Sequence, residues 1–452
     1  MAHNHKQIKP EYLFLILSLI LGPLYTIFMP LLHLPDELGH FYRVLTLLQG
    51  DLFCLPDGEA LLPVPVLPYL SGEGSQAMLW SHTSWSLNDA APTMVSVVNQ
   101  CLYLPLCYLF QVIGVGIPYL FTHNSIVLLF SGRLVSGLVC TLLIYQAIRL
   151  MPVGKHYLAL LALMPINLQE RFSLSVDNIT FAVCVLLIAL CLHLRYEPSV
   201  SKGKLGLLYA TLLFLSSCKV VYFLLALLVL LIPSDHFASK QKGHLHKLCA
   251  LGMTCVISLG WLIFAGTYLD ATKAGANAGE KVVYALSHPF RYLAVILRTQ
   301  YYWILDRNYI NDTVGKYLGL MDIEVPTYAV LVLYVLLIAA LFLDYLQNNK
   351  RDIPASILLM GTELLIVLAI LSSLYVQWTS GAPAQIGTIE GVQGRYYAPI
   401  FPAFFAGVLL LLPKINRHNH TEKDLSGILW ILFAILFLMQ LPVLYHLYHF
   451  AM

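Results

Sequence analysis

The chain has 452 residues, of which 59% are hydrophobic and only 11% are charged, and its mean hydropathy is +0.75. This composition excludes a soluble globular protein and indicates an all-α polytopic membrane protein, in which residues 1–452 form a single transmembrane domain in a lipid bilayer. The formal net charge is only +2 and no basic stripe with interleaved aromatic residues occurs, so we expect no nucleic-acid partner.

The nine cysteines fall mostly inside apolar segments, and no two of them form a CxxC pair. This pattern predicts neither a disulfide framework nor a zinc site. We therefore interpret the cysteines as small apolar residues of the membrane helices.

The first apolar run covers residues 11–32 and is long enough to cross a hydrocarbon core of about 30 Å. Lys6 and Lys9 precede it, which places the N-terminus in the cytoplasm. A cleaved signal peptide is the alternative, but no small-x-small cleavage site follows the run. We expect a retained membrane anchor.

Residues 34–124 read as a large first external loop, because prolines, glycines and acids interrupt the hydrophobic pattern. Within it, residues 94–113 are apolar enough to span the membrane, although Pro105 interrupts them. A crossing there would put Arg149 and Lys155 on the outside. We expect instead a helix that lies along the membrane interface.

Lysine and arginine clusters orient the remaining crossings, since they remain on the cytoplasmic side. Residues 205–232 are too long for one crossing and carry Lys219 in the middle, so we expect two short helices that meet near it. Eleven crossings are predicted in total, with further external loops at 270–324 and 376–395. Besides the first run and the pair in 205–232, the crossings are 125–148, 156–172, 179–194, 248–269, 325–346, 353–375, 396–413 and 426–448.

The charged stretch that follows the first apolar run is the strongest candidate site. Pro35 fixes the backbone that enters it, and two adjacent acids, Asp36 and Glu37, come next. If a helix begins at Asp36, then Asp36, His40 and Arg43 share one face. The alternative is a charged cap that holds the first membrane helix at the interface.

Three further charged residues stand near the predicted external surface or within the membrane. A central arginine such as Arg133 costs about 2.5–3.5 kcal/mol on insertion scales, so we expect it to face a polar cavity or a partner. The alternative is a carbonyl partner within the helix bundle. Asp177 and Lys219 reach the external side by the topology above, each at the end of a short helix.

The last external loop contains Gly391, Gln393 and Gly394, followed by Arg395 at the start of an inward helix. The glycines let backbone approach a ligand closely, and a guanidinium fits phosphate with two hydrogen bonds. The alternative is that Arg395 only anchors its helix at lipid headgroups. The loop 270–324, which includes Arg298, is rich in tyrosine, tryptophan and basic residues, as in a headgroup-level helix or a sugar-stacking wall.

Three short motifs carry a resemblance to a known family. They read Pro35-Asp36-Glu37-x-x-His40-Phe41-Tyr42-Arg43, Ser175-x-Asp177-Asn178 and Gly394-Arg395-Tyr396-x-x-Pro399. Together they resemble a family of predicted bacterial integral membrane proteins of unassigned function that is distantly similar to GT-C glycosyltransferases. The resemblance spans nearly the whole chain and implies a GT-C-like fold with a sugar donor linked to polyprenyl phosphate.

The resemblance also implies roles for individual residues. A catalytic acid in the first external loop of GT-C enzymes maps onto Asp36 and Glu37, and a second acid in the next external loop maps onto Asp177. An arginine in the second membrane helix of protein mannosyltransferases maps onto Arg133. We expect the acceptor to be a glycan or lipid of the cell envelope, reached outside the bacterial cytoplasmic membrane.

These residues are consistent with inverting sugar transfer in which Asp36 is the general base. The leaving phosphate would be bound by the cations Arg395, Lys219, Arg133 and Arg298. His40, Arg43, Asp177, Gln393 and Tyr396 would position the substrates. Asp36, Glu37 and Asp177 could instead hold a divalent metal, but the external cations make it dispensable, so we expect no cofactor.

Two other classes of function fit the same sequence. One is a transporter or flippase for lipid-linked glycans, which would carry charges deep in several helices. The other is a non-catalytic subunit of an envelope polysaccharide assembly system, which would not depend on Asp36. The acids that stand out here lie in external loops, which favours catalysis.

Overall fold

The structure is a computed structural model, and it describes residues 9–63, 86–87, 91–268, 278–306, 308–414 and 422–451. Seven helices in this part of the chain are long and apolar enough to cross a membrane, which confirms a polytopic membrane protein. These helices are α1 (Pro10–Phe28), α5 (Ser125–Leu150), α8 (Asp177–Tyr196), α10 (Lys240–Tyr268), α14 (Thr327–Gln347), α15 (Ile353–Gln377) and α17 (Glu422–Ala451).

The other predicted crossings fall on shorter helices. The run 156–172 is divided, because Pro165 cannot continue a helix and begins a new one. The predicted break near Lys219 is confirmed, with a helix on each side of it. The short helices are α6 (Lys155–Leu161), α7 (Pro165–Arg171), α9 (Lys202–Ser217), η5 (Val220–Leu231), η6 (Ser234–His236) and α16 (Phe401–Leu411).

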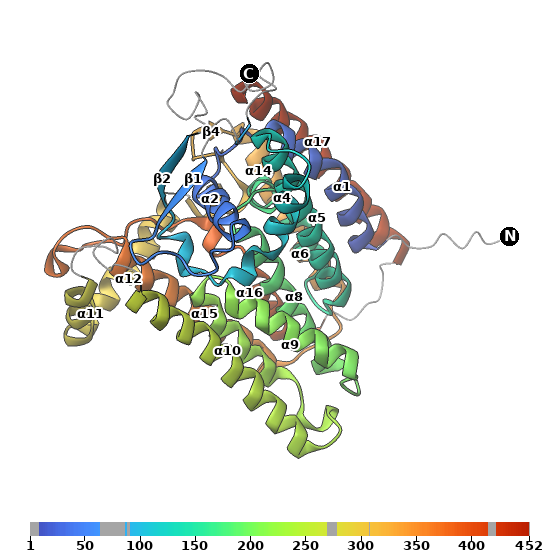
Figure 1. The fold of residues 1–452 in the computed structure, drawn as a ribbon. Coiled ribbons are helices and arrows are strands. Elements are labelled where there is room, and N and C mark those ends of the chain that lie inside the picture. The colour runs from blue at the N-terminus through green and yellow to red at the C-terminus, as the bar shows by residue number, and fades with distance from the viewer. Residues whose placement is uncertain are drawn as a thin grey trace.

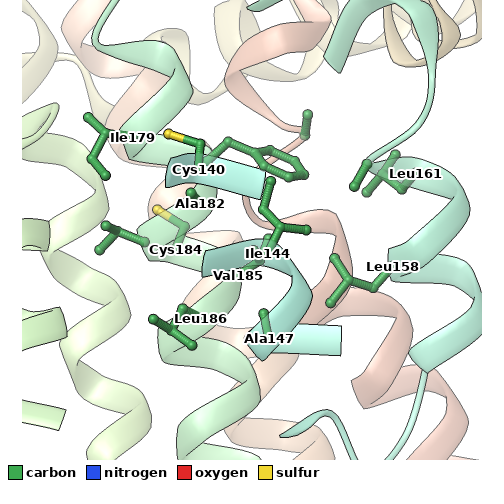
Figure 2. Packing of buried hydrophobic residues seen from close by; sticks show 14 of the residues in the cluster. Cys140, Ile144, Ala147, Leu158, Leu161, Ile179, Ala182, Cys184, Val185 and Leu186 are labelled. Carbon is green, nitrogen blue, oxygen red and sulfur yellow. The ribbon is translucent and has the colours of Figure 1, made fainter. Parts of the chain in front are cut away.

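The centre of the bundle is α8, which packs against α5 and η5. Apolar residues occur all round α8, and a helix of that kind is stable only when it is covered on every side. In Figure 2, Cys140, Ile144 and Ala147 of α5 lie against residues of α8 such as Cys184, with α6 close by. This core fixes the end of α8 that carries Asp177.

The segment between α1 and α5 is more structured than its sequence predicted. The expectation of one interfacial helix over 94–113 is wrong, because Pro105 separates a strand from the helix that follows. The elements are α2 (Glu37–Leu48), β1 (Glu59–Pro63), β2 (Pro92–Ser96), η3 (Gln100–Leu102), η4 (Pro105–Tyr108) and α4 (Leu109–Tyr119). β1 and β2 pair antiparallel, with Glu59 opposite Ser96, so the chain is not entirely helical.

A disulfide joins Cys54 to Cys101, which corrects the prediction that all cysteines are simple apolar residues. Both cysteines lie in the first loop, outside the membrane helices, and 47 residues separate them. The bond fastens the segment after α2 to η3.

The segments between α10 and α14 and between α15 and α16 also form short elements. They are α11 (Ala278–Ser287), α12 (Pro289–Leu305), α13 (Asn308–Val314), the antiparallel strands β3 (Tyr317–Leu318) and β4 (Ile323–Glu324), η8 (Pro383–Gln385) and η9 (Gly394–Tyr396). In Figure 1 the β1–β2 hairpin, α11 and α12 lie on the left, away from the turn at the bottom that leads into α10. The loop elements therefore gather at one end of the bundle.

The first and last of these long helices are neighbours in the bundle, where α17 packs along α1 (Figure 1). The Tyr25 hydroxyl donates a hydrogen bond to Gln440 over 2.7 Å, and Gln440 donates in turn to the carbonyl of Leu163. These bonds satisfy polar groups that the bilayer could not.

Candidate functional site

Glu37 and Arg133 form a fully buried ion pair between α2 and α5. Arg133 Nε donates to Glu37 Oε1 over 2.8 Å, and Arg133 Nη2 lies 2.5 Å from Glu37 Oε2. The remaining hydrogen bonds of the guanidinium go to the carbonyls of Thr26, Met29 and Pro30. The pair thus ties the end of α1 and the start of α2 to α5.

This geometry corrects two of the expected roles. Arg133 uses its Nε, Nη1 and Nη2 groups on protein acceptors, so we do not retain it as a phosphate-binding residue. Glu37 also accepts from the backbone N–H of Leu174 and is inaccessible to solvent, so we do not retain it as a catalytic acid. Both residues instead position the segment that carries Asp36, which matches the bundle-partner alternative for Arg133.

Asp36 stands at the N-terminal end of α2 with a left-handed backbone, at φ 63°. A non-glycine residue in this conformation is strained, and such strain is concentrated at functional sites. We predicted that Asp36, His40 and Arg43 share one helix face if the helix begins at Asp36. Helix α2 begins only at Glu37, so Asp36 precedes the helix. Its side chain is 60% exposed, and Oδ2 accepts a hydrogen bond from Arg395 Nη2 over 3.3 Å.

Arg395 is almost completely buried among three carboxylates. Besides Asp36, its Nη1 lies 3.4 Å from Asp177 Oδ2 and 3.8 Å from Glu170 Oε1. Burial lowers the pKa of Arg395, but Asp177 and Glu170 together raise it well above its ordinary value, so the side chain stays a cation. Within the described chain, Nε and Nη1 of Arg395 have no hydrogen-bond acceptor. The guanidinium therefore keeps hydrogen-bonding capacity that the described residues do not use.

A second cation, Lys219, stands beside this cluster. Its Nζ is 2.5 Å from Asp177 Oδ1 and 4.8 Å from the centre of the Tyr396 ring. Lys219 is placed by the break between α9 and η5, and Asp177 by the start of α8. Three of the predicted site residues, Asp177, Lys219 and Tyr396, thus come together with Asp36 and Arg395.

A cavity of about 270 Å³ opens next to the cluster. The polar part of its wall includes Asp36, His40, Lys219 and Tyr396, together with the amides of Asn99, Gln100 and Gln377 and the hydroxyls of Ser216, Ser258 and Ser373. The apolar and aromatic part comes mainly from η5, α10 and α15; it includes Val221, Trp261, Leu262, Ile370, Leu374 and Trp378. The cavity therefore combines the Lys219 ammonium and the Asp36 carboxylate with a surface suited to hydrocarbon.

His40 lines this cavity but carries no charge near neutral pH. Burial lowers its pKa to about 4, although Asp177 and Asp36 act in the opposite direction. Its Nδ1 lies 2.9 Å from the hydroxyl of Tyr108. His40 therefore presents a neutral imidazole to the cavity.

Arg43 does not reach Asp36, which corrects its expected orienting role. Its guanidinium donates to the hydroxyl of Thr46 and to the carbonyls of Asp51 and Leu52. These acceptors lie around the C-terminal end of α2, and Arg43 therefore points away from the N-terminal end of the helix, where Asp36 stands. Arg43 stabilises the chain reversal that leads to the disulfide-bonded segment.

Gln393 and Arg395 line a smaller, separate pocket together with Glu170 and Asp312. Asp312 of α13 accepts a hydrogen bond from the backbone N–H of Gly394 over 3.0 Å. A Cβ atom on Gly394 would lie 2.1 Å from the Cβ of Asp312, so only glycine fits this contact. The close approach sets the position of Arg395.

Arg298 is separate from this cluster. It lines another pocket, made by α12 and the loop 379–390, together with Glu390 and Tyr302. The structure thus gives no contact between Arg298 and the cations Arg395 and Lys219, and we do not retain Arg298 as a donor-phosphate residue.

Sequence reasoning missed Glu170, which is buried beside Arg395 and has one oxygen, Oε2, without a hydrogen-bond partner in the described chain. The signal was the polar group Gln169, Glu170 and Arg171 at the end of an otherwise apolar run. Ionisable residues within a membrane segment are a functional hypothesis by default. Asp312 had no comparable signal.

No group of three or more His, Cys, Asp or Glu side chains with the geometry of a metal site occurs in the described ranges. Asp36, Glu37 and Asp177 do not form the expected shared ligand set, because Glu37 faces Arg133 and Asp177 faces Lys219 and Arg395.

A family model described as "Predicted membrane protein (DUF2142)" matches residues 19–404. The matched range contains every residue of the cluster, from Asp36 to Tyr396. Neither the curated proteins nor the solved structures contain a match to this chain.

Proposed function

The chain belongs to the DUF2142 family of membrane proteins, and on that premise we propose that it is a glycosyltransferase that uses a sugar linked to a polyprenyl phosphate. The observation that carries the proposal is the position of Asp36. Its carboxylate borders both the Arg395 guanidinium and the cavity whose far wall is hydrocarbon-like. A base, an anion site and a lipid surface are thus adjacent.

The cavity fits the two chemically different parts of such a donor. Lys219 in the cavity wall and Arg395, which lies behind Asp36, supply cationic donors for the phosphate, and guanidinium binds phosphate with particular geometric specificity. Leu262 of α10 and Ile370 of α15 offer apolar surface to an isoprenoid chain. The outer face of α10 also exposes apolar side chains such as Val256 and Ile263, as a lipid-facing helix does. In this proposal the lipid chain lies between α10 and α15.

Asp36 then acts as the general base of an inverting transfer. The acceptor hydroxyl oxygen forms a bond to the anomeric carbon while the bond from that carbon to the phosphate oxygen breaks. The hydroxyl proton goes to the Asp36 carboxylate, and the electron pair of the broken bond stays on the phosphate. Arg395 and Lys219 stabilise the charge that develops there, so the mechanism assigns no cofactor.

The disulfide supports an external location for this site. Disulfides persist in oxidising compartments, and the Cys54–Cys101 bond closes the loop that follows Asp36 and α2. We therefore assign the site to the external face of the bacterial cytoplasmic membrane, with the N-terminus in the cytoplasm. The acceptor is an envelope glycan or lipid that is reached from that face.

Transport of a lipid-linked glycan is the second candidate, and one buried acid favours it. Glu363 lies in the middle of α15, and its Oε2 has no hydrogen-bond partner among the described residues. Such acids often line translocation paths. A transporter would depend on Glu363, whereas the transferase depends on Asp36.

Reconstitution tests the two functions against each other. Purified protein in liposomes is incubated with radiolabelled polyprenyl-phosphate sugars and an envelope extract that supplies acceptors. Transfer that is lost in Asp36→Asn and kept in Glu363→Gln supports the transferase. If intact donor moves across the bilayer, and this movement is lost in Glu363→Gln and kept in Asp36→Asn, the transporter function would replace the transferase proposal.

A further inference from the structure

The pocket that contains Arg298 is polar and lies outside the cluster around Asp36. It has a volume of about 380 Å³, within the range of small-molecule sites. The side chains around it are a guanidinium, a carboxylate, a phenol, an amide and several hydroxyls. They belong to Arg298 and Tyr302 of α12 and to Thr379, Ser380, Gln385, Thr388 and Glu390 of the last external loop.

The loop that forms most of this pocket is firmly attached to α11 and α12. Lys281 of α11 donates to the carbonyl of Thr379, and Arg291 of α12 donates to the carbonyl of Ala384. The hydroxyl of Thr299 accepts from the backbone N–H of Ile389 over 2.9 Å. Because three separate side chains bind its backbone, the loop presents a preformed surface, which reduces the entropy cost of binding.

The functional groups in the pocket are held ready for a polar ligand. The backbone N–H and the hydroxyl of Ser380 donate to Glu390, and these bonds lower the pKa of that carboxyl, which therefore accepts hydrogen bonds as a carboxylate. Within the described chain, no acceptor takes a hydrogen bond from Arg298. Tyr302 is 49% exposed and offers both a ring face and a hydroxyl.

One aromatic residue connects this pocket to the cavity. Trp378 lines the cavity and directly precedes Thr379 and Ser380, which line the pocket. Its ring packs on Gly391, where a Cβ atom would lie 2.5 Å from the indole. The segment from Trp378 to Arg395 thus contributes to the polar pocket, to the cavity wall and to the anion site.

We propose that the pocket lined by Arg298, Tyr302 and Glu390 binds the acceptor as a hydrophilic saccharide. The inference rests on the proposed transferase function, and it narrows the acceptor from a glycan or lipid to a sugar unit. Alternating donors and acceptors beside an exposed ring match a molecule with many hydroxyls and apolar ring faces. Of the residues that line the pocket, only Ile386 is aliphatic, and it is buried, so a hydrocarbon chain would find little surface there.

Gly387 offers a way to block the pocket without removing a polar group. A Cβ atom there meets only Arg298 Nη1, at 3.7 Å, so alanine fits and a leucine extends into the pocket. Gly361, on the exposed side of α15, has no atom within 4 Å of its Cβ position. Gly361→Leu is therefore the matched control for Gly387→Leu.

The experiment measures saturation-transfer NMR between detergent-solubilised protein and the methyl glycosides of glucose, N-acetylglucosamine and glucuronic acid. We expect saturation transfer to at least one glycoside in the parent and Gly361→Leu proteins, and none in Gly387→Leu. Arg298→Ala should weaken that affinity about tenfold or more, because it removes a charged hydrogen-bond donor. Because Arg298→Ala does not alter the loop backbone, it still tests the pocket if Gly387→Leu misfolds.

Retention of polyprenyl phosphate, measured on the same samples by native mass spectrometry, separates the two proposals. Two results overturn the saccharide pocket and leave the transferase proposal standing. One is the absence of saturation transfer to every glycoside in a parent protein that retains the lipid. The other is equal saturation transfer in the parent, Arg298→Ala and Gly387→Leu proteins. Glycoside binding with no affinity for the lipid keeps the pocket and removes the proposed donor.

Discussion

Asp36 Oδ2 accepts a hydrogen bond from Arg395 Nη2, although 359 residues separate the two in the chain. The contact is long at 3.3 Å, and the aspartate side chain stays 60% exposed. Its other oxygen, Oδ1, accepts no hydrogen bond from the residues that the structure describes. The arginine can therefore orient the carboxylate while one oxygen stays free to take a proton.

Replacing Asp36 with asparagine should remove the base and little else. A positioned base contributes about 10²- to 10⁴-fold in rate, so we expect Asp36→Asn to slow sugar transfer at least about a hundredfold while lipid-phosphate binding persists. The assay compares turnover of purified parent and variant. Asp57→Asn, an acid in the same loop outside the cluster, is the control. Undiminished turnover in Asp36→Asn would show that Asp36 is not the base, and Asp177 or Glu170 would then be the next candidate.

Replacing Arg395 should act on binding of the donor. Lysine keeps the charge but cannot form two parallel hydrogen bonds, so Arg395→Lys should bind polyprenyl phosphate about tenfold or more weakly, and Arg395→Ala more weakly still. Microscale thermophoresis with a fluorescent polyprenyl phosphate measures the affinities. Thermal unfolding of each variant checks that the bundle is intact. Equal affinity in the three proteins would contradict the anion site.

Glu37 and Arg133 should contribute to stability rather than to turnover. Removal of one partner leaves a buried charge unpaired, which costs about 3–5 kcal/mol. Glu37→Leu and Arg133→Met should each lower the unfolding temperature, and the double variant should lose less than the sum of the two. Additive losses measured in detergent would mean that the pair is not coupled.

The neutral state of His40 predicts a specific loss of stability in acid. The unfolded chain binds a proton on this residue near pH 6.5, but the folded chain does so only near pH 4. Stability should therefore fall as the pH drops from 6.5 to 4, by up to about 3 kcal/mol. His40→Gln should flatten this part of the pH profile, whereas His288→Gln, on the exposed side of the α11–α12 junction, should not. Identical profiles for parent and His40→Gln would refute the assignment.

The disulfide predicts the side of the membrane on which the site lies. Denatured but unreduced protein should show no reaction at Cys54 or Cys101 with a thiol-specific polyethylene glycol reagent. Loss of the bond in Cys54→Ser should reduce stability by about 2–4 kcal/mol. Cys249→Ser, which changes an unpaired cysteine of α10, is the control. Free thiols at both loop positions in protein isolated from intact cells would place the loop in the cytoplasm.

Sequence periodicity predicted the long helices well. The predicted crossings 325–346 and 353–375 correspond to α14 (Thr327–Gln347) and α15 (Ile353–Gln377). Long apolar runs leave only one favourable structure in a bilayer, so their positions follow from composition. The break at Lys219 was also predictable, because a charged residue in an apolar run must reach water or a partner.

The loops were less predictable, since their structure depends on distant partners. Nothing near Cys54 in the sequence indicates that Cys101 lies beside it. Asp36 has a left-handed backbone, and its neighbour Glu37 pairs with Arg133 of another helix, which local spacing does not reveal. Helical spacing therefore grouped Asp36 with Arg43, although the folded chain brings it to Arg395.

The distance along the chain between Asp36 and Arg395 also determines when their contact can form during biosynthesis. Ribosomes add about 5–20 residues per second, so roughly 18–72 s pass between synthesis of the first residue and synthesis of the second. During that interval Arg133 and Glu37 can already pair, and the disulfide can already close. The contact between Asp36 and Arg395 cannot yet form, so under the proposed function we expect a nascent chain with a folded first loop to bind no lipid phosphate.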